Sequence, residues 1–147
     1  MSALIQPFVT LAPSRTIKRS VALLGVGAVA WEGGIVCVDS ARPGAVWPAA
    51  GGIATLTPVG IFAASIDNSL GATVVQIGIE LQRERPVRYF DSVTGAGAVT
   101  LASMFAMLFL ASDHELTTIA TGNSPAGRML AMSPLGYPSG IGVEFPF

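Results

Sequence analysis

Apolar and polar residues alternate along several short stretches of the chain, which is the spacing of β-strands that have one buried face. The clearest alternation lies at residues 75–82, where every second side chain is aliphatic: Val75, Ile77, Ile79 and Leu81. The closing segment has the same period, with Ile141, Val143 and Phe145 on one side and Glu144 on the other. Both segments are therefore predicted to be strands.

Residues 109–132 predict an antiparallel meander. An apolar strand is followed by a polar turn at residues 112–115, a Thr-rich strand, the turn Gly122-Asn-Ser-Pro125 and a second apolar strand. Clusters of Gly, Asn, Asp, Ser and Pro supply the backbone conformations that turns require. By the same chemistry, residues 31–34 and 67–71 are predicted to be turns between strands.

Two segments leave alternatives open. A short helix near residues 99–105 competes with a strand, because four apolar side chains fit helical spacing: Leu101, Met104, Phe105 and Leu108. Residues 83–90 continue the strand before them or begin the next one, with Pro86 marking an edge or a bulge.

The distribution of Gly and Pro favours β over helix. The 17 Gly and 10 Pro are spread along the sequence, which indicates many short elements separated by turns. A chain of 147 residues can build one well-buried domain and is short for two. We expect a mainly β fold, an antiparallel β-barrel or sandwich with an extended N-terminal arm and at most one or two short helices. The arm is assigned to residues 1–20 and a single β-rich domain to residues 21–147.

The composition predicts a protein partner. Hydrophobic residues make up 51% of the chain and charged residues only 12%, whereas roughly 25% of an average globular domain is charged. Some apolar surface is therefore expected to meet another protein. Residues 1–20 show no strand or helix period, so they are interpreted as an arm of the kind that adds a strand to a neighbouring subunit. Candidate contact residues lie in the arm and at the two tryptophans: Leu4, Ile5, Phe8, Val9, Arg15, Lys18, Arg19, Trp31 and Trp47.

Charge and hydropathy argue against two other kinds of partner. The formal net charge of −1 gives no electrostatic reason to bind nucleic acid or an anionic membrane. Glu32 interrupts one apolar stretch, and residues 99–111 fall short of the roughly 20 that a transmembrane helix needs. Residues 15–30 resemble the basic and hydrophobic regions of a leader peptide, although the basic residues lie behind Pro7 and Pro13. We expect a soluble protein that binds neither nucleic acid nor membrane.

Two features resemble parts of cofactor or nucleophile sites. The segment Gly25-Val-Gly-Ala-Val-Ala30 matches the G-x-G-x-x-A turn of dinucleotide-binding proteins, but that turn needs a helix directly afterwards and Gly33-Gly34 follows instead. Cys37, the single cysteine, lies in an apolar run and is interpreted as a buried small hydrophobe, not a nucleophile.

A third candidate is the trio Asp113-His114-Glu115, which contains the single histidine. Neighbouring residues of a strand point to opposite faces, so these side chains are better explained as the solvated tip of a hairpin. Ser112 and Ser124 lack the strand-to-helix elbow that serine hydrolases require. We therefore assign no catalytic residue, no cofactor and no metal ion, and we expect that the protein is not an enzyme.

The order of turns and strands over residues 58–145 resembles the capsid-decoration, or cement, proteins of tailed bacteriophages. The matching pieces are Pro58-Val-Gly60, Asp67-Asn-Ser69 with Gly71-Ala72, residues 81–87, residues 108–114, Gly122-Asn-Ser-Pro-Ala-Gly-Arg128 and Val143-Glu-Phe145. Each piece alone is ordinary turn chemistry, and the order makes them moderately specific. The chain departs from the family at residues 99–110, which are unusually apolar, and its first 57 residues match weakly.

The resemblance implies a compact β-barrel or sandwich on the outer surface of a phage capsid. There the protein would bind the major capsid protein, contact copies of itself, commonly as a homotrimer, and cement neighbouring capsomers against the pressure of packaged DNA. Two other hypotheses stay open: a β module of a phage tail, neck or fibre, and a small enzyme or cofactor-binding protein that uses residues 25–30 or His114.

Overall fold

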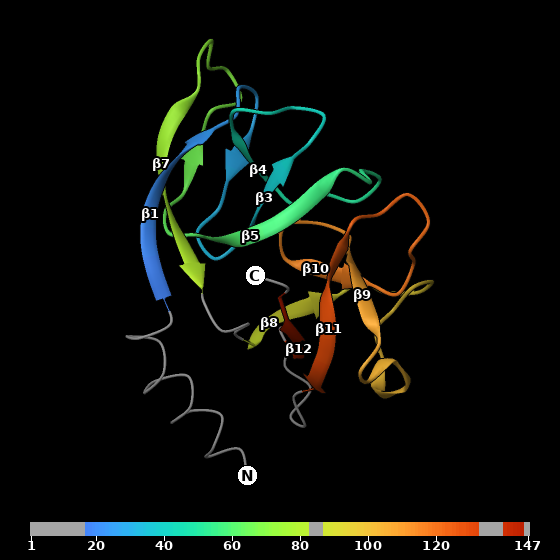
Figure 1. Ribbon diagram of the computed structural model, residues 1–147. Coiled ribbons are helices and arrows are strands. Elements are labelled where there is room, and N and C mark those ends of the chain that lie inside the picture. Colours follow the sequence, from blue (N-terminus) through green and yellow to red (C-terminus); the bar gives the residue numbers. More distant parts are fainter. Residues whose placement is uncertain (1–16, 83–86, 133–139, 146–147) are drawn as a thin grey trace.

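The structure is a computed structural model that describes residues 17–82, 87–132 and 140–145, and its regular elements are almost all strands (Figure 1). In chain order they are β1 (Ile17–Leu24), β2 (Val29–Ala30), β3 (Ile35–Asp39), β4 (Val46–Pro48), β5 (Leu56–Phe62), β6 (Ile66–Asp67), β7 (Val75–Gln82), β8 (Val87–Ser92), the 3₁₀ turn η1 (Leu101–Ser103), β9 (Met107–Leu110), β10 (Glu115–Thr117), β11 (Pro125–Met132) and β12 (Ile141–Glu144). Ten of these strands form two closed barrels and β2 pairs with β6 in a small separate sheet, which confirms the predicted mainly β, barrel-type fold.

The first barrel has the strand order β1-β4-β3-β5-β7. Strand β1 is antiparallel to β7 along its whole length, from Ile17 opposite Gln82 to Leu24 opposite Val75. The ring closes through one parallel pair, Leu24 with Val46. The barrel thus takes in residues 17–20, which the sequence analysis assigned to the arm, because pairing with β7 extends the strand beyond the apolar run that begins at residue 21.

The second barrel has the order β10-β8-β12-β11-β9. Strands β9 and β10 form a hairpin with Leu110 opposite Leu116, so the polar turn predicted at residues 112–115 is confirmed. Before β9, the predicted competition between helix and strand is resolved as the single 3₁₀ turn η1, where the Thr100 hydroxyl caps the turn by accepting the Ala102 N–H.

Strand β3 is buried on both faces and contributes side chains to the cores of both barrels, so it joins them. Successive side chains of a strand point to opposite sides. Ile35 and Cys37 belong to a core cluster filled mainly by the second barrel, whereas Val36 belongs to the core of the first barrel. On β5, Ile61 and Phe62 divide between the two clusters in the same way. We call these two strands the shared wall.

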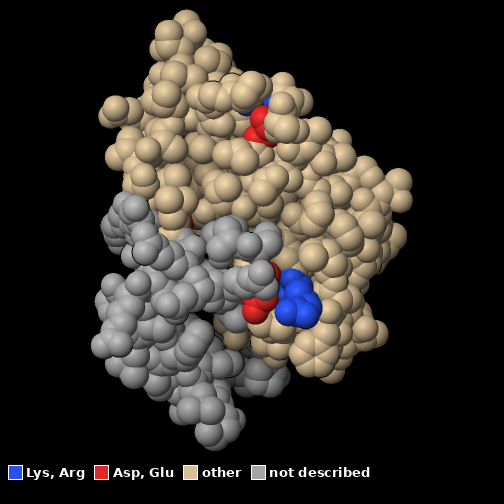
Figure 2. Space-filling model, in the orientation of Figure 1, with Lys and Arg blue, Asp and Glu red and all other residues tan. Residues whose placement is uncertain are grey.

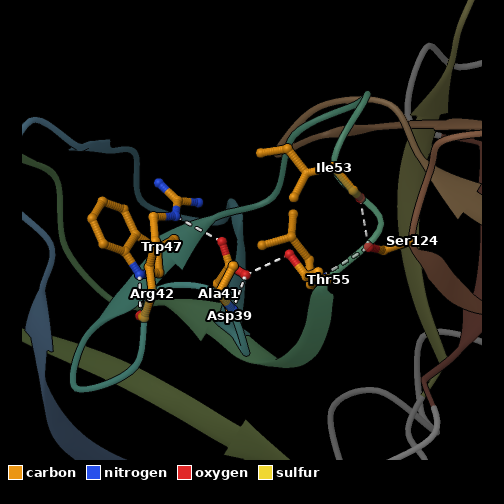
Figure 3. Close-up of polar contacts among 8 residues, drawn as sticks. Asp39, Ala41, Arg42, Trp47, Ile53, Thr55 and Ser124 are labelled. Atoms are coloured by element: carbon orange, nitrogen blue, oxygen red, sulfur yellow. Dashed lines mark hydrogen bonds and ion pairs between the residues drawn. The ribbon is translucent and has the colours of Figure 1, made fainter.

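A buried serine links the barrels at the rim of the shared wall (Figure 3). The Ser124 hydroxyl accepts the Leu56 N–H at 2.9 Å and donates to the Ile53 carbonyl at 2.7 Å. Ser124 is fully buried, so water cannot replace these bonds. Beside it, the Gly52 N–H donates to Asn123 Oδ1 at 2.7 Å.

Replacing Ser124 with Ala is expected to lower the free energy of unfolding by about 1–3 kcal/mol, because the Leu56 N–H and the Ile53 carbonyl would stay buried without partners. Chemical denaturation followed by fluorescence measures the change. The matched control is Ser40→Ala, which removes an exposed hydroxyl and should leave the unfolding free energy unchanged. An equal effect of both substitutions would contradict the role assigned to Ser124.

Candidate functional site

A cleft of about 660 Å³ lies where the two barrels meet. Its volume is within the range of roughly 300–1,000 Å³ that is usual for ligand pockets. The cleft is lined by residues from β2 and the turn after it, from the end of β4 and the two residues that follow, from β8 and from the β9–β10 hairpin: Val29, Trp31, Glu32, Gly33, Gly34, Pro48, Ala49, Ala50, Tyr89, Phe90, Asp91, Ala111, Ser112, Asp113 and His114.

A tight turn presents Trp31 at this cleft. The Gly34 N–H donates to the Trp31 carbonyl at 2.9 Å, and Gly33 has a φ of +87°, the combination that a type II turn requires. The next N–H, of Ile35, donates to the Asp113 carbonyl at 2.8 Å. The turn is therefore fixed directly against the β9–β10 hairpin, which confirms the turn predicted at residues 31–34.

Backbone hydrogen bonds also fix the far side of the cleft. The Asp91 N–H donates to the His114 carbonyl at 2.9 Å. The side chain of Asp91 is partly buried, and its Oδ1 is enclosed without a hydrogen-bond partner. Buried carboxylate oxygens are normally hydrogen-bonded, so this atom, which finds no donor among the described residues, is an unpaired acceptor beneath the surface of the cleft.

The hairpin tip brings Ser112, Asp113 and His114 together, but not in a catalytic arrangement. His114 Nδ1 lies 2.8 Å from Asp113 Oδ1 and 3.4 Å from Ser112 Oγ. In a Ser-His-Asp triad the carboxylate and the hydroxyl use different ring nitrogens, so that one nitrogen takes the serine proton while the carboxylate orients the ring through the other. Here both contact the same nitrogen. Ser112 Oγ also accepts the Glu115 N–H at 3.0 Å, which is the bonding of a polar turn.

The hydrogen bond that the His114 ring N–H donates to the Asp113 carboxylate raises the pKa of His114 above its usual value. Partial burial opposes this rise, and the nearby carboxylates of Asp113, Glu115 and Asp91 add to it. The imidazole is therefore held in its charged form at higher pH than in an unfolded chain.

Cys37 is fully buried in the shared wall, and burial together with the nearby Asp39 charge raises the pKa of its thiol to about 12. The thiolate is the reactive form of cysteine, so this side chain is inert in the folded protein.

The segment that matches a dinucleotide-binding turn does not lead into a helix. After β1 the chain turns at Gly27, whose φ is +86°, and β2 follows at Val29. Gly25 lies under the Trp47 indole, where an added Cβ would fall 2.3 Å from the ring. In the part of the chain that the structure describes, no group of three or more His, Cys, Asp and Glu residues is arranged to hold a metal ion.

The predicted contact residues are placed as follows. Trp31 is 62% exposed at the cleft. Trp47 is partly buried, with the Arg42 guanidinium carbon 3.8 Å from its ring centroid. Lys18 and Arg19 lie in β1, opposite Leu81 and Glu80. The remaining candidates lie outside the described residues: Leu4, Ile5, Phe8, Val9 and Arg15. Contact of any of these with a partner stays a prediction.

Two exposed apolar loops were missed by the sequence analysis. The Leu70 loop, residues 67–74, carries Leu70 at 99% exposure. The buried Asn68 amide fixes this loop by donating to the carbonyls of Gly25 and Thr73, both at 3.1 Å. The apolar Leu70 inside the predicted turn was the available signal, since turn tips are usually polar.

The second is the Phe105 loop, residues 101–107, with Leu101, Phe105 and Met107 exposed at 66%, 69% and 48%. Phe105 has a φ of +66°, in the left-handed region that only Gly, Asn and Asp adopt readily. In sequence this loop is hidden inside an apolar run that reads as ordinary core.

Comparisons of the chain with protein families, with curated proteins and with solved structures give no match. Among the described residues, none of the helical segments has the length and apolar character needed to cross a membrane.

The protonated His114 is expected to stabilise the fold, and the sign follows from its raised pKa. The contribution is complete below the unfolded value of 6.5 and is lost as pH rises through the higher folded value. Asp113→Asn should lower the pKa of His114 and shrink this pH-dependent part of the unfolding free energy. As His114 is the single histidine, an NMR titration of its ring protons measures the pKa without ambiguity. An unchanged titration curve in the variant would refute the assigned cause.

Cys37 is expected to resist a thiol reagent at pH 8 in the folded protein and to react at once after denaturation, because its thiol is both inaccessible and protonated. The release of chromophore by a disulfide reagent measures this. Cys37→Ser serves as the blank, and rapid labelling of the folded protein would show that the shared wall opens.

Proposed function

We propose that this protein is a structural component of a tailed-phage virion, which binds the outer surface of the capsid and cements neighbouring capsomers. In this role it contacts the major capsid protein and other copies of itself, as a homotrimer of the kind common in the family that the sequence resembles. The observation that carries the proposal is the pair of exposed apolar loops, the Leu70 loop, which precedes β7, and the Phe105 loop, which precedes β9. The two loops lie at opposite ends of the molecule in Figure 1.

A protein that cements two partners needs two contact surfaces that are far apart and held in fixed orientation. The Leu70 loop belongs to the first barrel and the Phe105 loop precedes β9 of the second. The shared wall and the hydrogen bonds of Ser124 hold the barrels together. The two loops are therefore presented as one rigid body, which reduces the entropy lost on binding.

The backbone of Phe105 supports the assignment of its loop to a partner. A bulky residue at positive φ costs on the order of 1 kcal/mol, and exposure of its ring to water gains nothing in return. The loop is nevertheless well ordered by hydrogen bonds from Phe105 N–H to the Met129 carbonyl and from Met129 N–H to the Ala106 carbonyl, both at 2.9 Å. Strain of this kind is typical of functional positions.

The surface agrees with association through apolar contact. On the face shown in Figure 2, the charged side chains of the described residues gather in small spots and the rest is uncharged. Binding that recognises only the assembled lattice stabilises that lattice by mass action, without a covalent link. The order of turn motifs over residues 58–145 is the further support, and it includes the turn that carries Leu70.

The direct test adds the purified protein to expanded capsids that lack it, taken from the phage that encodes the chain. We expect saturable, stoichiometric binding and a higher temperature of capsid disruption. Absence of binding would refute the proposal. Cryo-electron microscopy that finds the copies on the tail or neck instead of the shell would select the alternative of another virion β module.

Phe105→Asn is expected to raise the free energy of unfolding by about 1 kcal/mol and to weaken capsid binding, since Asn tolerates positive φ but removes the exposed ring. Thermal unfolding of the free protein and capsid co-sedimentation measure the two effects.

The matched control is Met107→Asn, which removes a neighbouring exposed apolar side chain from a residue without positive φ. It should weaken capsid binding without raising the unfolding free energy. A Phe105→Asn protein that is more stable and binds as well as the wild type would show that the loop is not a contact surface.

A further inference from the structure

The chain has two tryptophans, and one of them shows how this protein binds a guanidinium group. The guanidinium carbon of Arg42 lies 3.8 Å from the centroid of the Trp47 ring (Figure 3). Its Nε lies 2.7 Å from Asp39 Oδ2. The cation therefore contacts an aromatic face and a carboxylate at once, which is the pairing that the planar arginine side chain favours.

The other tryptophan, Trp31, also offers an aromatic face close to carboxylates, but no described cation lies over its ring. It lines the cleft together with three carboxylates: Glu32, Asp91 and Asp113. Among the described residues that line the cleft there is neither Lys nor Arg, and in the same parts of the chain the single cation placed over an aromatic ring is Arg42 over Trp47. The indole of Trp31 is 62% exposed.

The carboxylates of the cleft are not neutralised by their surroundings. Asp113 Oδ1 contacts the His114 ring, which offsets one acidic group when the imidazole is protonated. Asp91 Oδ1 is enclosed without a donor, and Glu32 is exposed at the rim. With three acids against one imidazole, the cleft carries an excess of negative charge that a bound cation would balance.

We propose that the cleft binds the arginine side chain of a partner protein. The guanidinium stacks on Trp31 and balances the negative charge of Asp91, and the other two carboxylates that line the cleft add to the attraction. Arginine fits better than lysine because its flat guanidinium stacks on an indole and donates along a fixed fork, whereas an ammonium is more strongly hydrated. The site is already formed, because backbone hydrogen bonds fix the Trp31 turn to Asp113 and His114 to Asp91. This inference goes beyond the proposed capsid role and does not depend on it.

The test follows the two indole N–H resonances of the full-length protein by NMR during addition of N-acetyl-arginine amide. The Trp31 resonance is expected to shift in a saturable way with roughly millimolar affinity, which is reasonable for a ligand of this size. The Trp47 resonance is the internal control, since its ring already holds Arg42 and its Nε1 donates to the Arg42 carbonyl at 3.2 Å. N-acetyl-citrulline amide has nearly the same shape without the charge and should cause no shift.

Substitutions locate the site. Asp91→Asn and Trp31→Leu should each weaken binding of the probe by roughly tenfold, because each removes one of the two main contacts. The matched control is Asp67→Asn, a carboxylate that is not among the residues lining the cleft, where the amide oxygen can still accept the Ser69 N–H. It should bind the probe like the wild type. The melting temperature is measured for each variant above the pH at which His114 titrates. There the imidazole is neutral and Asp91 Oδ1 makes no hydrogen bond to lose, so Asp91→Asn should not lower the melting temperature.

Several results would overturn the assignment. They are the absence of a Trp31 shift, an equal shift with citrulline or with N-acetyl-lysine amide, and equal weakening by Asp67→Asn. The Arg15→Gln protein is measured without any probe. If its Trp31 resonance differs from that of the wild type, Arg15 of the same chain occupies the cleft, and a partner's arginine is refuted as the occupant. None of these measurements involves a capsid, so failure here and failure of the proposed capsid role are distinguished.

Discussion

The rest of the structure depends on the burial of both faces of the shared wall, β3 and β5. Ile35 and Cys37 contribute to one core and Val36 to the other, so neither barrel can be removed without exposing apolar side chains of this wall. This double burial accounts for part of the high hydrophobic content, because a strand inside a molecule needs apolar residues at every position. The apolar excess that remains on the surface includes eleven large exposed side chains among the described residues, and Leu70 and Phe105 are the two most exposed of them.

Polar groups at the rim of the shared wall determine how the barrels are oriented. Ser124 joins the approach to β5 with the start of β11, and the hydrogen bond from Ile35 N–H to the Asp113 carbonyl joins β3 with the β9–β10 hairpin. Hydrophobic burial alone is not directional, whereas hydrogen bonds made by buried groups fix one arrangement, since breaking them leaves unpaired donors. The cleft and the two apolar loops inherit this rigidity, so their geometry is set before any partner arrives.

The sequence predicted the elements that have one buried and one exposed face. Strand β7 and the turns at residues 31–34 and 112–115 followed from local alternation and turn chemistry. The apolar run at Cys37 was recognised as buried, but a continuous apolar strand looks the same whether it serves one core or two. The start of β1 was placed too late, because Lys18 and Arg19 interrupt the apolar pattern while their backbone pairs with β7. The cleft could not be predicted, since Trp31, Asp91 and Asp113 come from separate parts of the chain and meet only through long-range backbone pairing.

Among the described residues, the buried Nε of Arg88 has no hydrogen-bond partner, and two further local costs remain: the positive φ of Phe105 and the unpaired oxygen of Asp91. Substitution of Phe105 with Asn would remove the first cost, and substitution of Asp91 with an apolar residue would remove the second. Either change would stabilise the free protein. Both costs also fall beside exposed aromatic groups, the ring of Phe105 itself and the indole of Trp31 at the cleft. An exposed aromatic ring is the surface feature that gains most from contact with another protein. The free protein is therefore less stable than it could be at the two places where contact with a partner would lower the free energy. This is the physical reason to look for binding there.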